Sequence, residues 1–344
     1  MDEFTITLNN LKKCGIDKIL ALENVTEIAV NEPETIWFEC GNGWESIAEP
    51  NCTYLNLDFL AISLAASCDT GELSRNNPIH SVSLPYGERG QLLVPPAVKE
   101  STISLTIRKP STKRFDLDSY VTSGRLDSAA VFTEIERSSS GLTEEQEYMS
   151  QLLAGRDFAT FLKESVNLKL NHITVGATGS GKTTFMKAIA DLYDASRRII
   201  TIEDTHELDL PNHPNKVHMF FKRDGVGVTA TELIESAMRM KPDHIFLTEL
   251  RGQESWSYLS ALNTGHSGSV TSVHANNNPL SVFARIAGLI KDSKTGSLLD
   301  YSLIMNTIMS TIDIISFWER SHLRSIYFNP QAKNQAMQKL ISSY

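Results

Sequence analysis

The stretch GATGSGKTT at residues 176–184 constrains the fold of this chain more than any other part of its sequence. It fits the pattern G-x-x-x-x-G-K-[ST] and follows the run HITV at residues 172–175, which favours a strand. Glycines let a backbone turn tightly and direct its N–H groups at phosphate oxygens, and the N-terminus of the next helix adds positive charge. The stretch therefore predicts a phosphate-binding loop between a strand and a helix. The alternative is a glycine-rich turn that carries a surface lysine.

Two residues of this loop have specific expected roles, with ATP and Mg²⁺ as the expected cofactors. Lys182 is expected to reach the β- and γ-phosphates, and the hydroxyl of Thr183 to coordinate Mg²⁺. The other expected nucleotide-binding residues form the rest of the loop and the first turn of the helix: Gly176, Ala177, Thr178, Gly179, Ser180, Gly181 and Thr184.

Strand-like runs alternate with helical ones after about residue 145, which predicts an α/β domain with a doubly wound, mainly parallel sheet. Residues 145–344 are assigned to this domain. The expected strands cover residues 173–175, 198–203, 217–221, 244–250 and 269–274. The helices between them show apolar residues at helical spacing.

The chain before the loop has a different pattern. Residues 1–107 mix short β-prone runs such as TIWF with helical segments and turn signals, which is typical of a small α+β domain. The stretches IRKPSTKRFDLDSY and SSSGLTEEQEY follow, and their polar, proline- and serine-containing composition favours a mobile linker over residues 108–144. We therefore expect two domains and a linker.

Composition excludes several classes of protein. The chain has 344 residues and a net charge of −9, and an acidic chain is a poor non-specific binder of nucleic acid. We expect no direct sequence-specific nucleic-acid binding. Because the sequence has neither a run of about 18 apolar residues nor a signal-peptide pattern, we expect a cytoplasmic protein.

Four cysteines lie in the first fifth of the chain, at Cys14, Cys40, Cys52 and Cys68. They form no Cys-x-x-Cys pair, so buried free thiols in a reducing compartment are expected rather than a zinc site.

Acidic residues follow the second and fourth expected strands of the α/β domain. TIEDTHEL places Glu203, Asp204 and Glu207 beyond the carboxyl edge of the sheet, where ligands of open α/β sheets bind. Such a carboxylate orients a water for attack on the γ-phosphate or holds the hydration shell of the metal. The alternative is a solvated acidic loop. In the second run, IFLTELRG, an apolar strand is followed by Thr248 and Glu249. Glu249 fits either a metal-positioning or water-polarising acid or a helix-capping acid.

Two histidines follow in the run NTGHSGSVTSVHANN. Their eight-residue spacing does not suit a helical metal site. His266 and His274 are interpreted as phosphate or charge sensors, with a satisfied core or interface histidine as the alternative for either.

Four stretches of the sequence together resemble the four motifs of the secretion ATPases. They are GATGSGKTT, TIEDTHEL, the LRG that follows Glu249, and NTGHSGSVTSVHAN. The N-terminal runs LPYGERGQLLVPPAV and ISLTIRKPS narrow the resemblance to the VirB-type ATPases of type IV secretion systems. The resemblance extends over about residues 28–328, in the right order. Thr248 stands where this family most often has Gly, and no tetracysteine zinc module like that of type II relatives is visible.

The resemblance implies an N-terminal α+β domain, a linker and a RecA-like domain that carries the loop. It implies a homo-hexamer that hydrolyses ATP, with Lys182, Glu207 and Glu249 as catalytic residues. His274 is also expected to be catalytic. Thr183 and Glu249 are the implied metal-positioning residues. Arg108, in TIRKPS, matches an N-domain arginine that contacts the terminal phosphate of the nucleotide. The alternative interpretation is that Arg108 belongs to a solvated basic linker.

The expected function is therefore that of a ring motor for protein or DNA-protein transport, conjugation or pilus assembly. Expected partners are other type IV secretion components at the inner face of the bacterial inner membrane, with peripheral association through proteins. Three alternatives remain: a pilus-retraction or type II secretion motor, a nucleotide-gated assembly factor with little turnover, and a DNA helicase or strand-exchange protein. The acidic charge and the lack of an aromatic and basic strip argue against the last.

Overall fold

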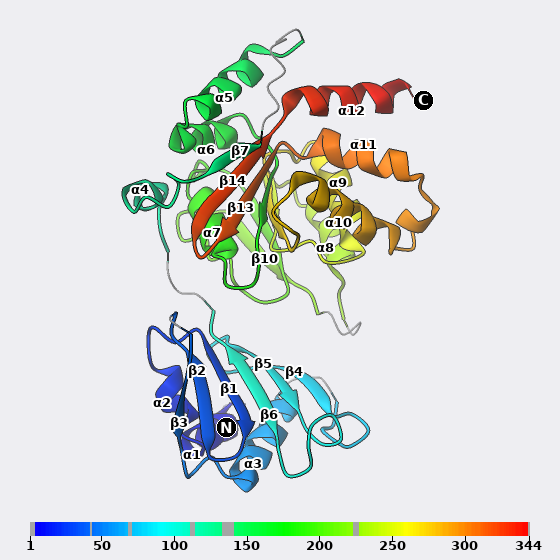
Figure 1. The fold of residues 1–344 in the computed structure, drawn as a ribbon. Coiled ribbons are helices and arrows are strands. Elements are labelled where there is room, and N and C mark those ends of the chain that lie inside the picture. The colour runs from blue at the N-terminus through cyan, green and yellow to red at the C-terminus, as the bar shows by residue number, and fades with distance from the viewer. Residues whose placement is uncertain are drawn as a thin grey trace. The chain divides into compact units, whose positions relative to one another are not determined.

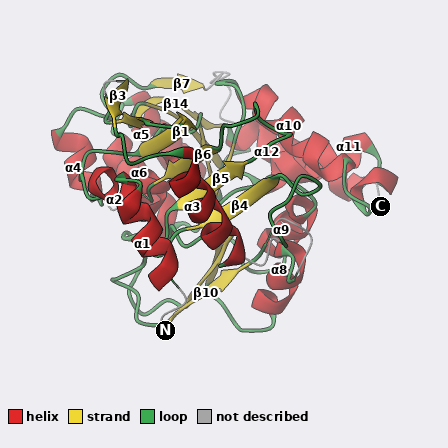
Figure 2. Ribbon diagram, turned by 90° about the horizontal axis from the view of Figure 1, so that it is seen from below, coloured by secondary structure: helices red, strands yellow, loops and turns green. Residues whose placement is uncertain are grey.

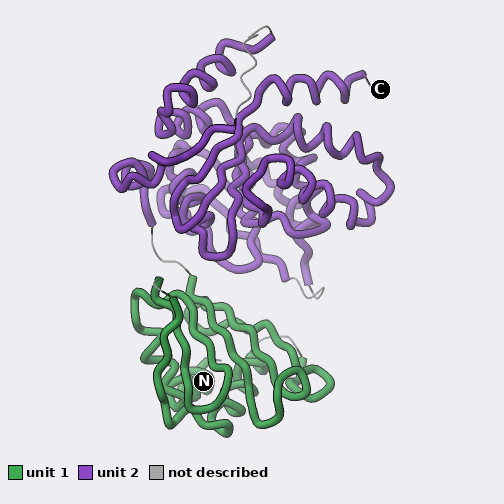
Figure 3. Tube along the Cα trace, in the orientation of Figure 1, with its two compact units in different colours: residues 1–112 green, residues 113–344 purple. Residues whose placement is uncertain are grey.

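The computed structural model describes residues 4–41, 43–67, 71–110, 114–132, 141–222 and 227–342. The chain divides into two compact units, residues 1–112 and 113–344 (Figure 3). Each unit has its own hydrophobic core.

The first unit is an antiparallel six-stranded sheet with helices on one face. The strand order is β3-β2-β1-β6-β5-β4. Its elements are α1 (Thr5–Lys13), α2 (Ile16–Leu20), β1 (Glu27–Glu32), β2 (Thr35–Glu39), β3 (Trp44–Ala48), α3 (Tyr54–Ala66), β4 (Ile79–Ser83), β5 (Arg89–Leu93) and β6 (Ser104–Arg108). Helices α1 and α3 lie side by side over the sheet (Figure 2).

Alternation of side chains explains how this sheet forms a core. In β6, Leu105 and Ile107 are buried while the residues between and after them are more exposed. Successive strand residues point to opposite faces, so one face of the sheet packs on the helices and the other meets solvent. Thr53 begins α3 by accepting a hydrogen bond from the Asn56 amide.

None of the described cysteines of this unit forms a disulfide bond. Cys14 and Cys52 are fully buried, as expected, whereas Cys40 is partly exposed. Cys68 lies outside the described residues.

The second unit contains an eight-stranded sheet in the order β10-β9-β11-β12-β8-β13-β14-β7. Its strands are β7 (Ala130–Phe132), β8 (His172–Val175), β9 (Ile199–Glu203), β10 (Lys216–Phe220), β11 (His244–Leu247), β12 (Val270–Val273), β13 (Ile314–Glu319) and β14 (His322–Phe328). The strands from β10 to β13 in this order are parallel, and β14 is antiparallel to β13. The predicted doubly wound, mainly parallel sheet is confirmed.

Helices cover both faces of this sheet (Figure 1). One face carries α4 (Leu117–Thr122), α5 (Glu144–Ala154), α6 (Phe158–Asn167) and α7 (Lys182–Ala190). The other carries α8 (Ala230–Met238), α9 (Glu254–Asn263), α10 (Pro279–Lys291) and α11 (Tyr301–Thr311), and α12 (Pro330–Ser342) packs along α11. The short helix η1 (Gly296–Leu298) joins α10 to α11. Strand residues alternate between the two cores: Ile200 and Ile202 enter one, Ile199 the other.

The five strands expected from the sequence all occur, with bounds that differ by one residue, except that β11 ends at Leu247. The expected linker contains more structure than its composition indicates. Helix α4 packs on the second unit, and β7 pairs in parallel with β14. Thr143 and Gln146 form a capping box that begins α5 inside the stretch interpreted as mobile. Of the described helices, none has both the length and the apolar character of a membrane span.

Candidate nucleotide-binding site

The glycine-rich loop connects β8 to α7 as the sequence predicts. Gly179 and Gly181 have φ angles of 72° and 96°, a region that glycine adopts without steric cost. Gly181 is the N-cap residue of α7, which begins at Lys182. The N–H groups of the first helical turn have no partner within the helix, so this end of α7 favours an anion.

A turn from a distant part of the chain supports this loop from behind. The amide of Ser321, between β13 and β14, donates to the carbonyl oxygen of Ser180 at 2.9 Å. A Cβ atom on Gly181 would come within 3.0 Å of Ser321 Oγ, and one on Gly176 would collide with the carbonyl oxygen of Trp318. These glycines are therefore required for the close packing of the β13–β14 turn against the loop.

The interior of the loop fits a phosphate group. The Lys182 ammonium donates to the carbonyl oxygens of Gly176 and Ala177 at 2.7 and 2.9 Å, so it lies within the loop. Ser180 Oγ is buried and, among the described residues, has no hydrogen-bond partner. A Cβ atom on Gly179 would meet nothing within 4 Å. The loop thus combines a cation, an orphaned hydroxyl and open space at its tip.

Thr183 lies next to the first acidic motif. Its hydroxyl donates a hydrogen bond to Glu207 Oε2 at 2.9 Å. Both side chains are partly exposed. Hydroxyl and carboxylate oxygens are ligands that Mg²⁺ accepts, directly or through water, so this pair fits the expected cation.

Glu203 holds the loop that carries Glu207. Its side chain is fully buried, and its Oε2 accepts hydrogen bonds from the amides of Glu207 and Leu208 at 2.7 and 2.8 Å. Burial by itself raises the pKa of this carboxyl, but hydrogen bonds from His218, the Leu208 amide, Thr201 and the Glu207 amide outweigh burial and lower the pKa to about 2. Glu203 is therefore a charged positioning residue rather than a solvated acid.

Glu249 and His274 come together beyond β11 and β12. His274 Nε2 lies 3.4 Å from Glu249 Oε1, and Arg251 makes a short ion pair with the same carboxylate. Glu249 is not the N-cap of the next helix, because the N-cap residue of α9 is Gln253. The structure thus favours a site residue over the capping alternative for Glu249.

His266 is placed differently from His274. It precedes β12 at the opposite edge of the sheet, where the Gly268 amide donates to Asn171 Oδ1 at 2.9 Å. Strands β12 and β8 pair in parallel, with Val270 opposite His172 and Val273 opposite Val175. The phosphate-binding loop follows Val175, so it lies at the other end of this strand pair from His266. The expected sensor role of His266 therefore has no support, and the alternative of a structural histidine fits its position.

Arg108 ends β6 in the first unit. Its guanidinium is half exposed, and its Nε lies 3.9 Å from Glu27 Oε1. This residue is part of a strand and not of a basic linker. Its contact with a nucleotide stays a prediction.

Lys187 and His218 are two residues near the acidic motif that the sequence reasoning missed. Lys187 is largely buried on α7, and burial lowers its pKa, opposed chiefly by the charge of Glu207. Lys187 follows Lys182 and Thr183 by about one helical turn, and this spacing could have predicted that it lies near the site. His218 has no comparable signal, because it reaches Glu203 only through the pairing of β10 with β9.

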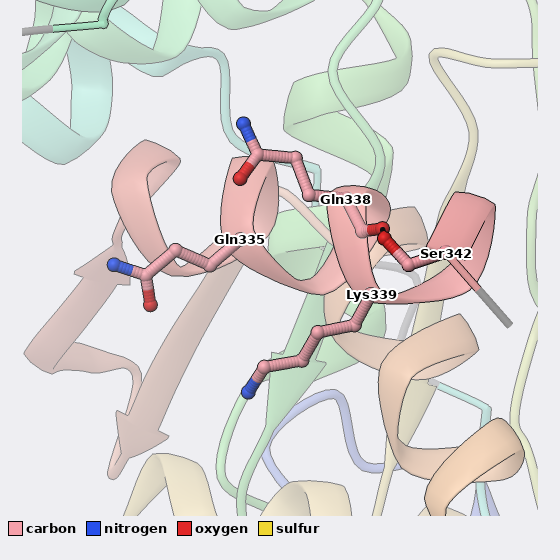
Figure 4. Close-up of a pocket in the computed structure, with 4 residues that line it drawn as sticks. All are labelled: Gln335, Gln338, Lys339 and Ser342. Atoms are coloured by element: carbon pink, nitrogen blue, oxygen red, sulfur yellow. Dashed lines mark hydrogen bonds between the residues drawn. The ribbon is translucent and has the colours of Figure 1, made fainter.

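A separate hollow lies along α12 and is lined by Gln335, Gln338, Lys339 and Ser342 (Figure 4). The described residues that line it include neither a carboxylate nor a glycine-rich turn. It therefore lacks the groups that a nucleotide site needs.

Comparison with known proteins identifies the family. The model of the type II/IV secretion system proteins matches residues 130–316. The type IV secretion system protein VirB11 of Bartonella henselae is 37% identical over 342 residues, which cover 96% of this chain and 95% of that protein. The chain belongs to the VirB-type secretion ATPases.

Solved structures agree with this assignment. The crystal structure of the VirB11 ATPase from the Brucella suis type IV secretion system, in complex with sulphate, is 33% identical. It covers 98% of each chain with a TM-score of 0.54. The pilus retraction motor PilT with bound ADP has a TM-score of 0.59 at 15% identity, covering 96% of this secretion ATPase and 88% of the motor, and shares the fold alone.

Proposed function

We propose that this protein is the ATPase of a type IV secretion system and that it hydrolyses ATP to ADP and phosphate. The observation that carries the proposal is the contact between Thr183 and Glu207 beside a loop that holds Lys182. The relatives at 37% and 33% identity over nearly the whole chain support the same function. We infer from the resemblance that six subunits form a ring at the inner face of the bacterial inner membrane, in contact with other secretion components.

Each residue of the site has a proposed task. The amides of the loop and Lys182 bind the β- and γ-phosphates, while Thr183 and Glu249 hold Mg²⁺, which neutralises phosphate charge when bound. Glu207 orients the attacking water, and Glu203 fixes the loop that carries it. His274 positions the carboxylate of Glu249. Arg108, delivered from the first unit, neutralises the charge that develops on the terminal phosphate.

The deciding experiment measures phosphate release per subunit over a range of protein concentrations. Lys182→Ala is the blank, because it removes the phosphate-binding cation from the loop. We expect a specific rate that rises with concentration, as ring assembly requires, and that vanishes in the blank. ATP binding without turnover at any concentration would contradict the proposal and favour a nucleotide-gated assembly factor. Unchanged turnover in Lys182→Ala would exclude this site as the active site.

A further inference from the structure

Three side chains of the types that can bind metals gather at the acidic motif. Glu203 ends β9, His206 lies in the loop after it, and His218 lies on the edge strand β10. One ligand atom from each lies within 4.8 Å of the other two. The cluster exists because β10 pairs in parallel with β9, which places His218 opposite Thr201.

We propose that Glu203, His206 and His218 bind a divalent transition-metal ion, with Zn²⁺ as the best match. Glu203 Oε1 lies 3.5 Å from His206 Nδ1 and 3.3 Å from His218 Nδ1. In a tetrahedral site with metal–ligand bonds of about 2.0–2.1 Å, neighbouring ligand atoms are separated by about 3.3 Å. The two contacts thus already have the separation that such a site requires. One carboxylate and two imidazoles leave a fourth position for water.

The carboxylate of Glu203 is divided between two tasks. Its Oε2 binds the amides of Glu207 and Leu208, while its Oε1 faces the histidines. A metal ion on Oε1 therefore leaves the amide contacts intact. The hydroxyl of Thr201 donates to Oε1 at 2.6 Å, so it orients the carboxylate from outside the ligand shell.

Access and ligand chemistry decide which ion fits. The side chain of His206 is 49% exposed and that of His218 is 18% exposed, so an ion reaches the cluster from solvent. Imidazole nitrogens favour Zn²⁺, Co²⁺, Ni²⁺ and Cu²⁺, whereas Mg²⁺ prefers oxygen ligands in an octahedron. The site is therefore distinct in selectivity from the Mg²⁺ position beside Thr183.

Metal binding here joins β9, the acidic loop and the edge strand β10. The cluster lies next to the proposed active site, because Glu203 accepts a hydrogen bond from the amide of Glu207. The carboxylate of Glu207 in turn contacts Thr183. The inference does not rest on the proposed ATPase activity.

The test titrates Co²⁺ into the full-length protein, with any affinity tag removed and no nucleotide present, and records its visible absorption. We expect one equivalent of Co²⁺ with the intense bands of four-coordinate geometry, retained when Mg²⁺ is in large excess. His206→Ala and His218→Ala should each weaken binding about tenfold or more. The matched control is His322→Ala, which removes a histidine at the start of β14, outside the cluster.

Several outcomes separate the interpretations. Equal Co²⁺ affinity in His206→Ala and the unmodified protein would overturn the proposal, as would the absence of binding. A thiolate charge-transfer band would also overturn it, since that band assigns the ion to the cysteines. If His218→Ala does not fold, the exposed His206 decides the question. Lys182→Ala should lose phosphate release but keep the Co²⁺ bands, so failure of the ATPase proposal is distinguishable from failure of this one.

Discussion

The hydroxyl of Thr183 donates a hydrogen bond to Glu207 Oε2 at 2.9 Å, joining the first turn of α7 to the acidic motif after β9. The two residues are separated by 24 positions in the sequence. Their contact assembles the expected metal-binding hydroxyl and a candidate catalytic carboxylate on one side of the phosphate-binding loop.

Glu207→Gln tests the role of that carboxylate. The amide retains an acceptor for Thr183 but cannot orient or deprotonate a water as a carboxylate does, so we expect kcat to fall about 100-fold or more. Nucleotide affinity should change by only a few fold. Steady-state phosphate release and binding of a fluorescent ADP analogue measure the two effects. A larger loss of kcat in the neighbouring variant Asp204→Asn would assign the role to Asp204 instead.

Gly176→Ala tests the support of the loop by the β13–β14 turn. The added Cβ would collide with the carbonyl oxygen of Trp318, which belongs to a strand and cannot move aside. We expect the free energy of unfolding to fall by about 1–3 kcal/mol and nucleotide affinity to fall with it. Gly288→Ala is the matched control, because a Cβ there meets nothing within 4 Å. Equal thermal stability of the two variants would refute the packing argument.

Arg108→Ala tests the arginine of the first unit. If Arg108 neutralises charge that develops only during phosphate transfer, hydrolysis should slow strongly while nucleotide affinity stays within a small factor. Arg75→Ala is a suitable control, since it removes an exposed arginine that pairs with Glu100 in the same unit. Parallel losses in affinity and rate would instead indicate a structural role for Arg108.

His172→Gln tests a source of acid sensitivity. Burial lowers the pKa of His172 from 6.5 to about 3. Between these values the unfolded chain binds a proton that the folded chain does not, so stability is complete above pH 6.5 and decreases as the pH falls toward 3.

The glutamine side chain has no such proton and still reaches the hydroxyl of Ser316, which His172 Nε2 contacts at 2.8 Å. In this variant the free energy of unfolding should vary less steeply with pH, by on the order of 1 kcal/mol per unit. Urea denaturation between pH 7 and pH 5 measures the slope, with His322→Gln as the control. Identical slopes in the variant and the unmodified protein would show that His172 titrates normally.

Local patterns were sufficient to predict the loop, the strands around it and the α/β class of the second unit. The glycines of the loop, the lysine and the helix after it are adjacent in sequence, so their geometry follows from a short stretch of backbone. The linker was harder to predict. Its strand β7 is stabilised by pairing with β14, nearly 200 residues later, and its own composition gives no sign of that pairing.

The position of individual side chains in the site also depended on distant segments. The sequence alone does not distinguish Glu203, Asp204 and Glu207, which lie in one acidic motif. Of the three, only Glu203 is buried, because it accepts hydrogen bonds from the amides of Glu207 and Leu208 and contacts Thr201 and His218. Likewise, His266 and His274 lie in one motif yet lie at opposite ends of β12.

The sequence by itself determined that this chain carries a phosphate-binding loop, at which strand end it lies, and to which family it belongs. Only the tertiary structure decided which acid supports the loop and which faces Thr183, that the β13–β14 turn packs behind the glycines, and that two histidines meet at Glu203. The physical reason is that turns and helix starts depend on neighbouring residues, whereas burial, hydrogen bonding and ligand spacing depend on strands that the sheet brings together from distant parts of the chain.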